Sequence, residues 1–368
     1  MWIEPVIQAD YVRQLLAGNR RALARTISLV EDGAAEAPAM LSALYQHTGR
    51  AHVIGVTGAP GTGKSTLVNA LARAYRADGR TVGVIAVDPT SPFSGGALLG
   101  DRVRMRDLAG DPGIFIRSMA TRGNLGGLAH ATADVISVLD AAGFERILVE
   151  TVGVGQAEID IASAAHTTIV VEAPGLGDEV QAIKAGVLEI ADIFAVNKAD
   201  REGADHTVMA LQMMQGLTPA PAGHHQVENP GTANLPRQVE DSGVPNLFGG
   251  FSGQRTRAPD RRHPAPGPQS DGGWLPPICK TVAPRGEGVE TLHAWVEAHA
   301  GHLRATGGWT RRATAHAAAE LEHILADRLM ARLRARLSAD RFAQMVSAIA
   351  QRAIDPYSAA DQLLAQFV

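Results

Sequence analysis

The sequence predicts an α/β protein with a mainly parallel central sheet, a helical N-terminal extension and a C-terminal helical arm. Three observations support this fold class. Short β-rich runs alternate with helical stretches between residues 52 and 196, which is the pattern of a parallel sheet with helices on both faces. A glycine-rich phosphate-loop motif joins the first of these strands to the next helix. The chain ends in an Ala/Leu/Arg-rich helical region from about residue 301.

The composition argues against nucleic-acid-binding, membrane and disulfide-rich proteins. The chain has 368 residues, with 34 Lys and Arg against 38 Asp and Glu and a formal charge of −4. This balance gives no electrostatic reason to expect nucleic acid or an anionic membrane as a partner. The single cysteine, Cys279, cannot form an internal disulfide, so we expect a cytoplasmic protein. No apolar run reaches the ~18 residues that a membrane helix needs, and the first residues do not show the basic-then-apolar pattern of an export signal, so we expect neither membrane insertion nor export.

Residues 1–50 are predicted to form the helical extension. Between residues 10 and 31, apolar side chains recur at spacings of seven, four and three. They are Leu16, Leu23, Ile27 and Val30. This periodicity predicts one amphipathic helix with all four side chains on a single stripe.

Residues 51–300 are predicted to form the nucleotide-binding domain. We expect strands at residues 52–57, 81–87, 114–117, 146–150, 167–172, 193–196 and 277–282. The pattern breaks between residues 216 and 276, which hold ten Gly and ten Pro, half of the protein's proline. Because this composition cannot bury much apolar area, we interpret residues 216–273 as a flexible insertion.

Residues 301–368 are predicted to form the helical arm. Helical patterns cover about residues 313–337, 339–353 and 357–367. Five leucines recur four apart, namely Leu321, Leu325, Leu329, Leu333 and Leu337. Such a stripe packs either into the protein's own core or against a second chain, and the pattern alone favours the core.

The strongest functional signal is the phosphate loop. Residues 58–65 match the pattern G-x-x-x-x-G-K-[ST] in full, after a predicted strand and before a predicted helix. Backbone N–H groups of such a loop surround phosphates, its lysine reaches the β and γ oxygens, and its serine supplies a hydroxyl to Mg²⁺. The residues predicted to hold the nucleotide here are Gly58, Ala59, Pro60, Gly61, Thr62, Gly63, Lys64, Ser65 and Thr66.

Three acidic residues are placed where they can serve a phosphate-bound Mg²⁺. Asp88 and Glu150 end strands, and Asp101 lies in a Gly-Asp-Arg segment. Carboxyl ends of parallel strands face the ligand crevice of an open α/β sheet, and Mg²⁺ prefers oxygen ligands. We therefore predict that Ser65, Asp88, Asp101 and Glu150 form the metal site. Beyond Glu150, the backbone N–H of Gly153 is predicted to sense the γ-phosphate.

A second motif predicts that the base is guanine. Asn197, Lys198 and Asp200 fit the element N-K-x-D directly after a predicted strand. A carboxylate can accept hydrogen bonds from guanine N1–H and the exocyclic amine, whereas adenine offers no such donor pair on that edge. Residues Val282, Ala283 and Pro284 follow the last strand, where a backbone N–H would meet the guanine carbonyl. GTP, GDP and Mg²⁺ are therefore the expected ligands.

Residues 172–179 form a Pro/Gly-rich turn ahead of a helical pattern that contains Lys184. The residues alone leave two interpretations open. The turn is either a moving element of the nucleotide site or an ordinary strand-to-helix loop with a solvated lysine.

Together these segments resemble the MeaB/ArgK family of P-loop GTPases, the chaperones associated with methylmalonyl-CoA mutase. The resemblance covers about residues 8–215 and 274–368. Beyond the phosphate loop, it is seen in residues 87–92, 95–102, 150–156 and 177–184. Such a set of segments is highly specific. The chain departs from the family pattern in the Gly/Pro-rich insertion and at Val282, where serine is usual.

The resemblance implies a homodimeric GTPase whose helical arm mediates dimerisation. It implies an adenosylcobalamin-dependent acyl-CoA mutase as client, with an adenosyltransferase as a further candidate partner. GTP binding and hydrolysis would gate cofactor delivery, and the mutase would accelerate hydrolysis. It assigns catalytic roles to Lys64, Asp101, Glu150 and Lys184, with Lys184 in an additional switch that the mutase contacts.

Two other functions stay open. A GTPase that inserts nickel into a metalloenzyme would need Cys and His ligands, for which Cys279 alone is poor support. An ATP-dependent kinase of an amino-acid transport system is a label that some family members have had, and Asp200 argues against it.

Overall fold

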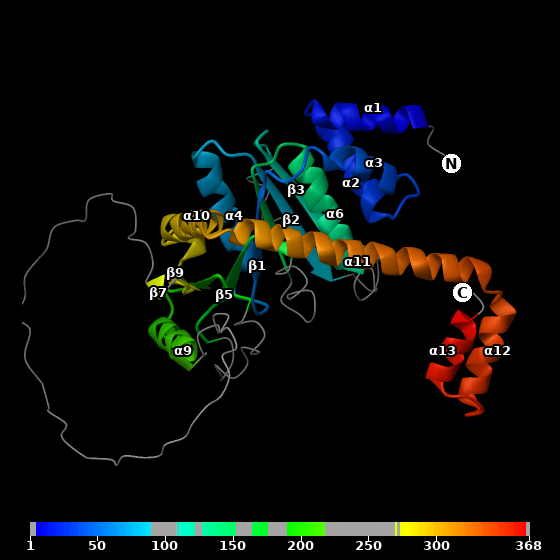
Figure 1. Cartoon of the computed structure of the whole chain (residues 1–368). Coiled ribbons are helices and arrows are strands. Elements are labelled where there is room, and N and C mark those ends of the chain that lie inside the picture. Colours follow the sequence, from blue (N-terminus) through cyan, green and yellow to red (C-terminus); the bar gives the residue numbers. More distant parts are fainter. Residues whose placement is uncertain are drawn as a thin grey trace, which may run out of the picture.

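The computed structural model describes residues 5–89, 108, 110–121, 127–151, 164–175, 190–217, 269–270 and 273–365. Its centre is a seven-stranded sheet with the strand order β3-β2-β4-β1-β5-β6-β9. Every pair of neighbouring strands in this sheet is parallel. Helices lie on both faces of the sheet (Figure 1). The predicted fold class, a mainly parallel α/β sheet with helical termini, is confirmed.

The strands follow the apolar runs of the sequence. They are β1 (His52–Thr57), β2 (Val82–Pro89), β3 (Ile114–Thr121), β4 (Arg146–Glu150), β5 (Thr167–Glu172), β6 (Ile193–Val196) and β9 (Ile278–Lys280). Every residue of β1, β4 and β6 is buried. Because helices cover both faces of a parallel sheet, its strands are continuously apolar and do not alternate with polar residues.

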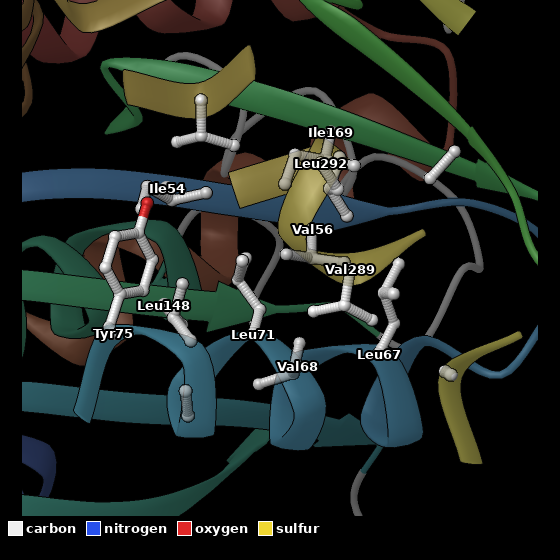
Figure 2. Close-up of a cluster of buried hydrophobic side chains, with 14 of the residues drawn as sticks. Ile54, Val56, Leu67, Val68, Leu71, Tyr75, Leu148, Ile169, Val289 and Leu292 are labelled. Atoms are coloured by element: carbon white, nitrogen blue, oxygen red, sulfur yellow. The ribbon is translucent and has the colours of Figure 1, made fainter. Parts of the chain in front are cut away.

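One face of the sheet is covered by α4 (Lys64–Ala77) and α10 (Val289–Ala305). Figure 2 shows the α4 side chains of Leu67, Leu71 and Tyr75 directed toward the strands, with Leu292 of α10 in the same cluster. These four side chains are almost fully buried. At roughly 1.5–3 kcal/mol for each large apolar side chain buried, this cluster is a main source of the domain's stability.

The opposite face is covered by α6 (Gly127–Ala141) and by the N-terminal helices α1 (Pro5–Leu16), α2 (Arg20–Glu31) and α3 (Ala37–Tyr45). The remaining described elements of the domain are α9 (Ala204–Leu217), η3 (Ala283–Arg285) and an antiparallel pair, β7 (Gln269–Ser270) with β8 (Gly273–Trp274). Of the predicted insertion, residues 218–268 and 271–272 lie outside the described residues. No helix in the described ranges is long and apolar enough to cross a membrane.

The prediction of one helix over residues 10–31 is wrong. The chain breaks at Gly18, whose φ is +83°, and α2 begins after Asn19. The Asn19 side chain caps α2 by accepting hydrogen bonds from the N–H groups of Arg21 and Ala22, at 2.9 and 3.2 Å. Leu16 therefore ends α1 with 38% of its surface exposed and is not part of the buried stripe of α2.

The C-terminal arm consists of α11 (Gly308–Arg336), α12 (Ala339–Ala350) and α13 (Pro356–Leu364). Figure 1 shows α11 as a long straight helix that starts beside α10, passes the sheet and ends near α12. Leu321, Leu325 and Leu329 on α11 are 58%, 50% and 63% exposed. For these three residues the exposure contradicts the preference for the protein's own core that the pattern alone gives, while the dimerisation implied by the family resemblance stays a prediction.

Candidate nucleotide site

The phosphate loop connects the carboxyl end of β1 to the first turn of α4. Gly58, Gly61 and Gly63 have φ angles of +134°, +83° and +93°, a region that favours glycine. A Cβ on Gly58 would lie 2.1 Å from the carbonyl oxygen of Val171, and one on Gly63 would lie 2.5 Å from Nδ2 of Asn197. Glycine is needed at both positions because the loop lies directly against β5 and against the Asn197 side chain.

Lys64 is held inside the curve of this loop. Its ammonium group donates to the carbonyl oxygens of Gly58 at 2.8 Å and Ala59 at 3.0 Å. The residue is only 5% exposed. Phosphate oxygens can replace these neutral carbonyls as stronger, charge-assisted acceptors. The loop thus keeps its cation in position for an anionic ligand.

Ser65 and Glu150 form a buried hydroxyl–carboxylate pair beside Lys64. The Ser65 Oγ donates to Oε1 of Glu150 at 2.6 Å. The two residues meet because β4 lies next to β1, with Glu150 in register with Val56. A hydroxyl and a carboxylate are hard oxygen ligands of the kind that Mg²⁺ prefers, so the donor set of this pair fits that ion.

Asn197 joins three segments of the site through one buried side chain. Its Nδ2 donates to the carbonyl oxygen of Thr62 at 2.8 Å. Its Oδ1 accepts from Oγ1 of Thr281 and from the N–H of Ala283, both at 3.2 Å. The phosphate loop, the end of β6 and the loop after β9 are therefore parts of a single site.

Lys198 and Asp200 follow Asn197 at the same edge of the sheet. Lys198 has a positive φ of +55° and donates from Nζ to the carbonyl oxygen of Gly61 at 2.6 Å. Asp200 is exposed, and its Oδ2 lies 3.5 Å from Nη2 of Arg285. The N-K-x-D segment thus contacts the phosphate loop on one side and the loop after β9 on the other.

The loop after β9 offers few backbone donors. The N–H of Val282 donates to the carbonyl oxygen of Glu287 at 2.9 Å, and Pro284 has no N–H. Ala283 donates only the 3.2 Å hydrogen bond to Asn197. Among the three residues predicted at this position, Ala283 is therefore the one whose N–H best suits a ligand carbonyl.

Several predicted site residues are not described. Asp101, Gly153 and Lys184 lie outside the described residues, and of Asp88 only the backbone in β2 is described, in register with Ala120. Thr66 lies half-buried in the first turn of α4.

Two features of the site were not predicted from the sequence. The hydroxyl of Thr151 donates to that of Thr57 at 3.0 Å, and both residues are buried. They flank Glu150 and Gly58, so the pair fixes the ends of β4 and β1 relative to each other. The second feature is Arg285 beside Asp200. The sequence held a clue to each feature. Thr57 and Thr151 stand at the ends of predicted strands, and Arg285 follows Ala283 by two residues in the chain.

Comparison with known proteins identifies similar sequences. The sequence matches, over residues 23–338, the family described as methylmalonyl Co-A mutase-associated GTPase MeaB. A putative GTPase of Pyrococcus horikoshii is 42% identical over 359 residues, which are 98% of each chain. A Cupriavidus metallidurans protein named fused isobutyryl-CoA mutase is 37% identical over 247 residues, or 65% of this chain and 22% of that protein.

A solved structure described as LAO/AO transport system kinase has a similar fold. The alignment covers 100% of this chain and 99% of that one, with a TM-score of 0.65 and 22% identity. At this identity the likeness concerns the fold alone.

Proposed function

Because this chain belongs to the family of methylmalonyl Co-A mutase-associated GTPases, MeaB, we propose that it gates the delivery of adenosylcobalamin to an acyl-CoA mutase. Its GTP binding and hydrolysis would also protect or reactivate that mutase. The observation that best supports a guanine-nucleotide site is the Asn197 side chain, which joins the phosphate loop at Thr62 to the loop after β9 at Ala283.

In this proposal the phosphate end of the nucleotide is bound by the loop and by Lys64. The ammonium group exchanges the carbonyls of Gly58 and Ala59 for phosphate oxygens, while the N–H groups of the loop and of the first turn of α4 face the same anion. Ser65 and Glu150, with Asp88 and Asp101, would hold Mg²⁺, which neutralises charge that develops on the phosphates.

Base recognition is assigned to Asp200 and Ala283. The carboxylate of Asp200 accepts from N1–H and the amine of guanine, and the N–H of Ala283 donates to the guanine carbonyl. With adenine, the Asp200 carboxylate would face the N1 acceptor of the base. The carboxylate would then have no hydrogen-bond donor from the base, which disfavours adenine binding. Lys198 holds the phosphate loop against this region through its bond to Gly61.

Hydrolysis without a partner is expected to be slow. None of the described residues at the site is an arginine placed to neutralise the γ-phosphate, and such a group accelerates GTP hydrolysis by about 10³–10⁵-fold in other GTPases. We assign Gly153 to sensing the γ-phosphate and Lys184 to a switch that the mutase contacts. The mutase would complete the site by moving these segments.

The choice of partner rests on the relatives. The family description names a mutase, and the relative from Cupriavidus metallidurans is named fused isobutyryl-CoA mutase, with 22% of its length matching this chain. A fused pair keeps the two proteins at high effective concentration, which favours a functional contact. We further propose that residues 301–368 mediate a homodimer, because three leucines of α11 are exposed.

The test is hydrolysis of GTP and ATP by the purified protein, alone and with candidate adenosylcobalamin mutases. We expect slow, GTP-selective turnover that rises when the client mutase is added. Fast turnover that no mutase increases would contradict the proposal. ATP-selective turnover would favour a kinase, and stoichiometric nickel binding would favour a metallochaperone.

A further inference from the structure

Arg285 forms two ion pairs at the edge of the base site. Its Nη2 lies 3.5 Å from Oδ2 of Asp200, and its Nε lies 2.7 Å from Oε1 of Glu287. All three side chains are about half exposed, between 42% and 59%. The guanidinium group therefore lies between the carboxylate assigned to guanine and a second carboxylate on its own loop.

Backbone hydrogen bonds keep Arg285 close to Asp200. The N–H of Ala199 donates to the carbonyl oxygen of Thr281 at 3.0 Å, which connects the two loops. The loop after β9 is folded back by an antiparallel bridge between Val282 and Glu287. The N–H of Arg285 donates to the carbonyl oxygen of Val282 at 3.0 Å inside this turn.

The glycine that follows this turn shows that the backbone of the turn is closely packed. Gly288 has a φ of +74°, and a Cβ there would lie 2.0 Å from the carbonyl oxygen of Lys280. The turn is thus packed against the end of β9. The position of Arg285 follows from a constrained backbone as well as from its two ion pairs.

We propose that Arg285 is a positioning residue for guanine binding, acting through Asp200. This inference rests on the proposed role of Asp200 as the base-reading carboxylate. An ionised carboxylate has about four lone-pair sites. The N1–H and amine of guanine use two of them, so the guanidinium can stay on a third.

Glu287 holds the guanidinium group of Arg285 in place when a base binds. The contact from Arg285 to Glu287 is shorter than the contact to Asp200, at 2.7 Å against 3.5 Å. The guanidinium is therefore held in place when guanine reaches Asp200, and it orients the carboxylate. Arginine suits this role because its planar fork remains charged at all physiological pH values.

The experiment measures the dissociation constants of GDP and GTP by calorimetry. Arg285→Gln is compared with Arg201→Gln, which removes the same charge from an exposed position adjacent to Asp200. We expect Arg285→Gln to weaken both nucleotides equally, by about three- to fivefold, the upper range for an exposed ion pair. Arg201→Gln should bind both as the unchanged protein does, and Arg285→Lys should recover part of the loss.

The Asp200→Asn background separates a local role from a general charge effect. There Arg285→Gln should change GDP binding by less than a factor of two, because the carboxylate through which it acts is gone. The inference would be overturned by an equal loss of affinity in both backgrounds. It would also be overturned if Arg285→Gln bound the nucleotides as tightly as the unchanged protein, or more tightly. If the unchanged protein bound no guanine nucleotide, the proposed function itself would fail. Circular dichroism verifies that each variant is folded.

Discussion

The imidazole ring of His166 stacks on the indole ring of Trp309, with ring centroids 3.9 Å apart and planes inclined by 9°. His166 directly precedes β5, and Trp309 lies in the first turn of α11. Nearby, Arg312 donates to both carboxylate oxygens of Asp192, at 2.9 and 2.7 Å. These contacts attach the first turns of α11 to the amino ends of the strands, opposite to the nucleotide site.

A chain of buried polar groups extends this attachment into the sheet. Oγ1 of Thr167 lies 2.8 Å from Nε2 of His52 and 2.9 Å from Nδ1 of His299. Nε2 of His299 lies 3.3 Å from Asp192. We call this group the arm root. Its members are His52, His166, Thr167, Asp192, His299, Trp309 and Arg312.

Loss of the Arg312 guanidinium should weaken the arm root. In Arg312→Gln, Asp192 keeps its contacts with His299 and the N–H of Thr168 but loses its bidentate partner. We expect a decrease of about 1.5–3 kcal/mol in the free energy of unfolding, the range for a hydrogen bond to a charged group.

The neighbouring arginine provides the control for this experiment. Arg311 is exposed and donates only to the carbonyl oxygen of Thr306 within the described contacts. Arg311→Gln should therefore change the free energy by less than about 0.5 kcal/mol. Urea unfolding of both variants measures the difference, and equal losses would contradict a specific role of Arg312.

The same site predicts how stability depends on pH. Burial lowers the pKa of His299 to about 4 and that of His166 to about 3. Arg312 and His302 also lower the pKa of His299, and Asp192 opposes them. Below the unfolded-state pKa of about 6.5, the unfolded chain binds protons that the folded protein does not bind at these two sites.

The free energy of unfolding should therefore be highest above pH 6.5 and fall as the pH is lowered toward 4. Each histidine contributes a slope of up to about 1.4 kcal/mol per pH unit. Urea unfolding at pH 7, 6 and 5 measures this slope, and His299→Gln should reduce it. A slope that is the same with and without His299 would show that other groups cause the acid sensitivity.

Lys64 is expected to be required for nucleotide binding. Lys64→Ala removes the lysine of the phosphate loop itself, and a charge-assisted hydrogen bond of about 1.5–3 kcal/mol corresponds to a loss of roughly 10–100-fold. Lys280→Ala is the control, because that lysine is half exposed and pairs with Asp205 on the surface. Calorimetry with GDP measures both, and unchanged affinity in Lys64→Ala would remove the loop from the site.

Some features of the fold and the site could be predicted from the sequence, and others could not. The phosphate loop and the N-K-x-D segment were found because their residues are adjacent in the chain. The break at Gly18 was missed because the spacing of Leu16 to Leu23 also fits a continuous helix, although a Gly–Asn pair often marks a helix boundary.

The missed contacts depend on which strands are neighbours. The Thr57–Thr151 bond requires β1 to lie beside β4, and Arg285 reaches Asp200 because β9 lies beside β6. The stack of His166 on Trp309 depends on the direction in which α11 leaves α10. Periodicity reports which face of an element is buried but not which element covers it.

Asp200 should determine which base is bound. In Asp200→Asn the amide can donate to the additional carbonyl of xanthine and no longer accepts two hydrogen bonds from guanine. We expect GTP binding to weaken by at least about tenfold, the effect of a lost charge-assisted hydrogen bond, and xanthosine triphosphate binding to improve. Competition between the two nucleotides measures the change, and an unaltered preference would exclude Asp200 from the base site.

The exposed leucines of α11 should hold two copies of the chain together. Leu325 and Leu329 lie one helical turn apart and are at least half exposed, and a contiguous apolar surface of this kind is typical of an interface. The double substitution Leu325→Asp and Leu329→Asp should convert a dimer into a monomer in analytical ultracentrifugation.

A second double variant on the same helix provides the matched control for this last experiment. Ala331 and Ala335 are exposed residues of α11, and each lies two residues from the adjacent stripe leucines, which rotates it by about 200° to the other side of the helix. Ala331→Asp with Ala335→Asp adds the same two charges and should leave the dimer intact.

The nucleotide site provides the internal control. It lies at the carboxyl ends of the strands, whereas α11 begins at their amino ends, so GDP affinity should stay within about twofold in the variant that lacks Leu325 and Leu329. A protein that is already monomeric at micromolar concentration before any substitution would show that these leucines face a different partner.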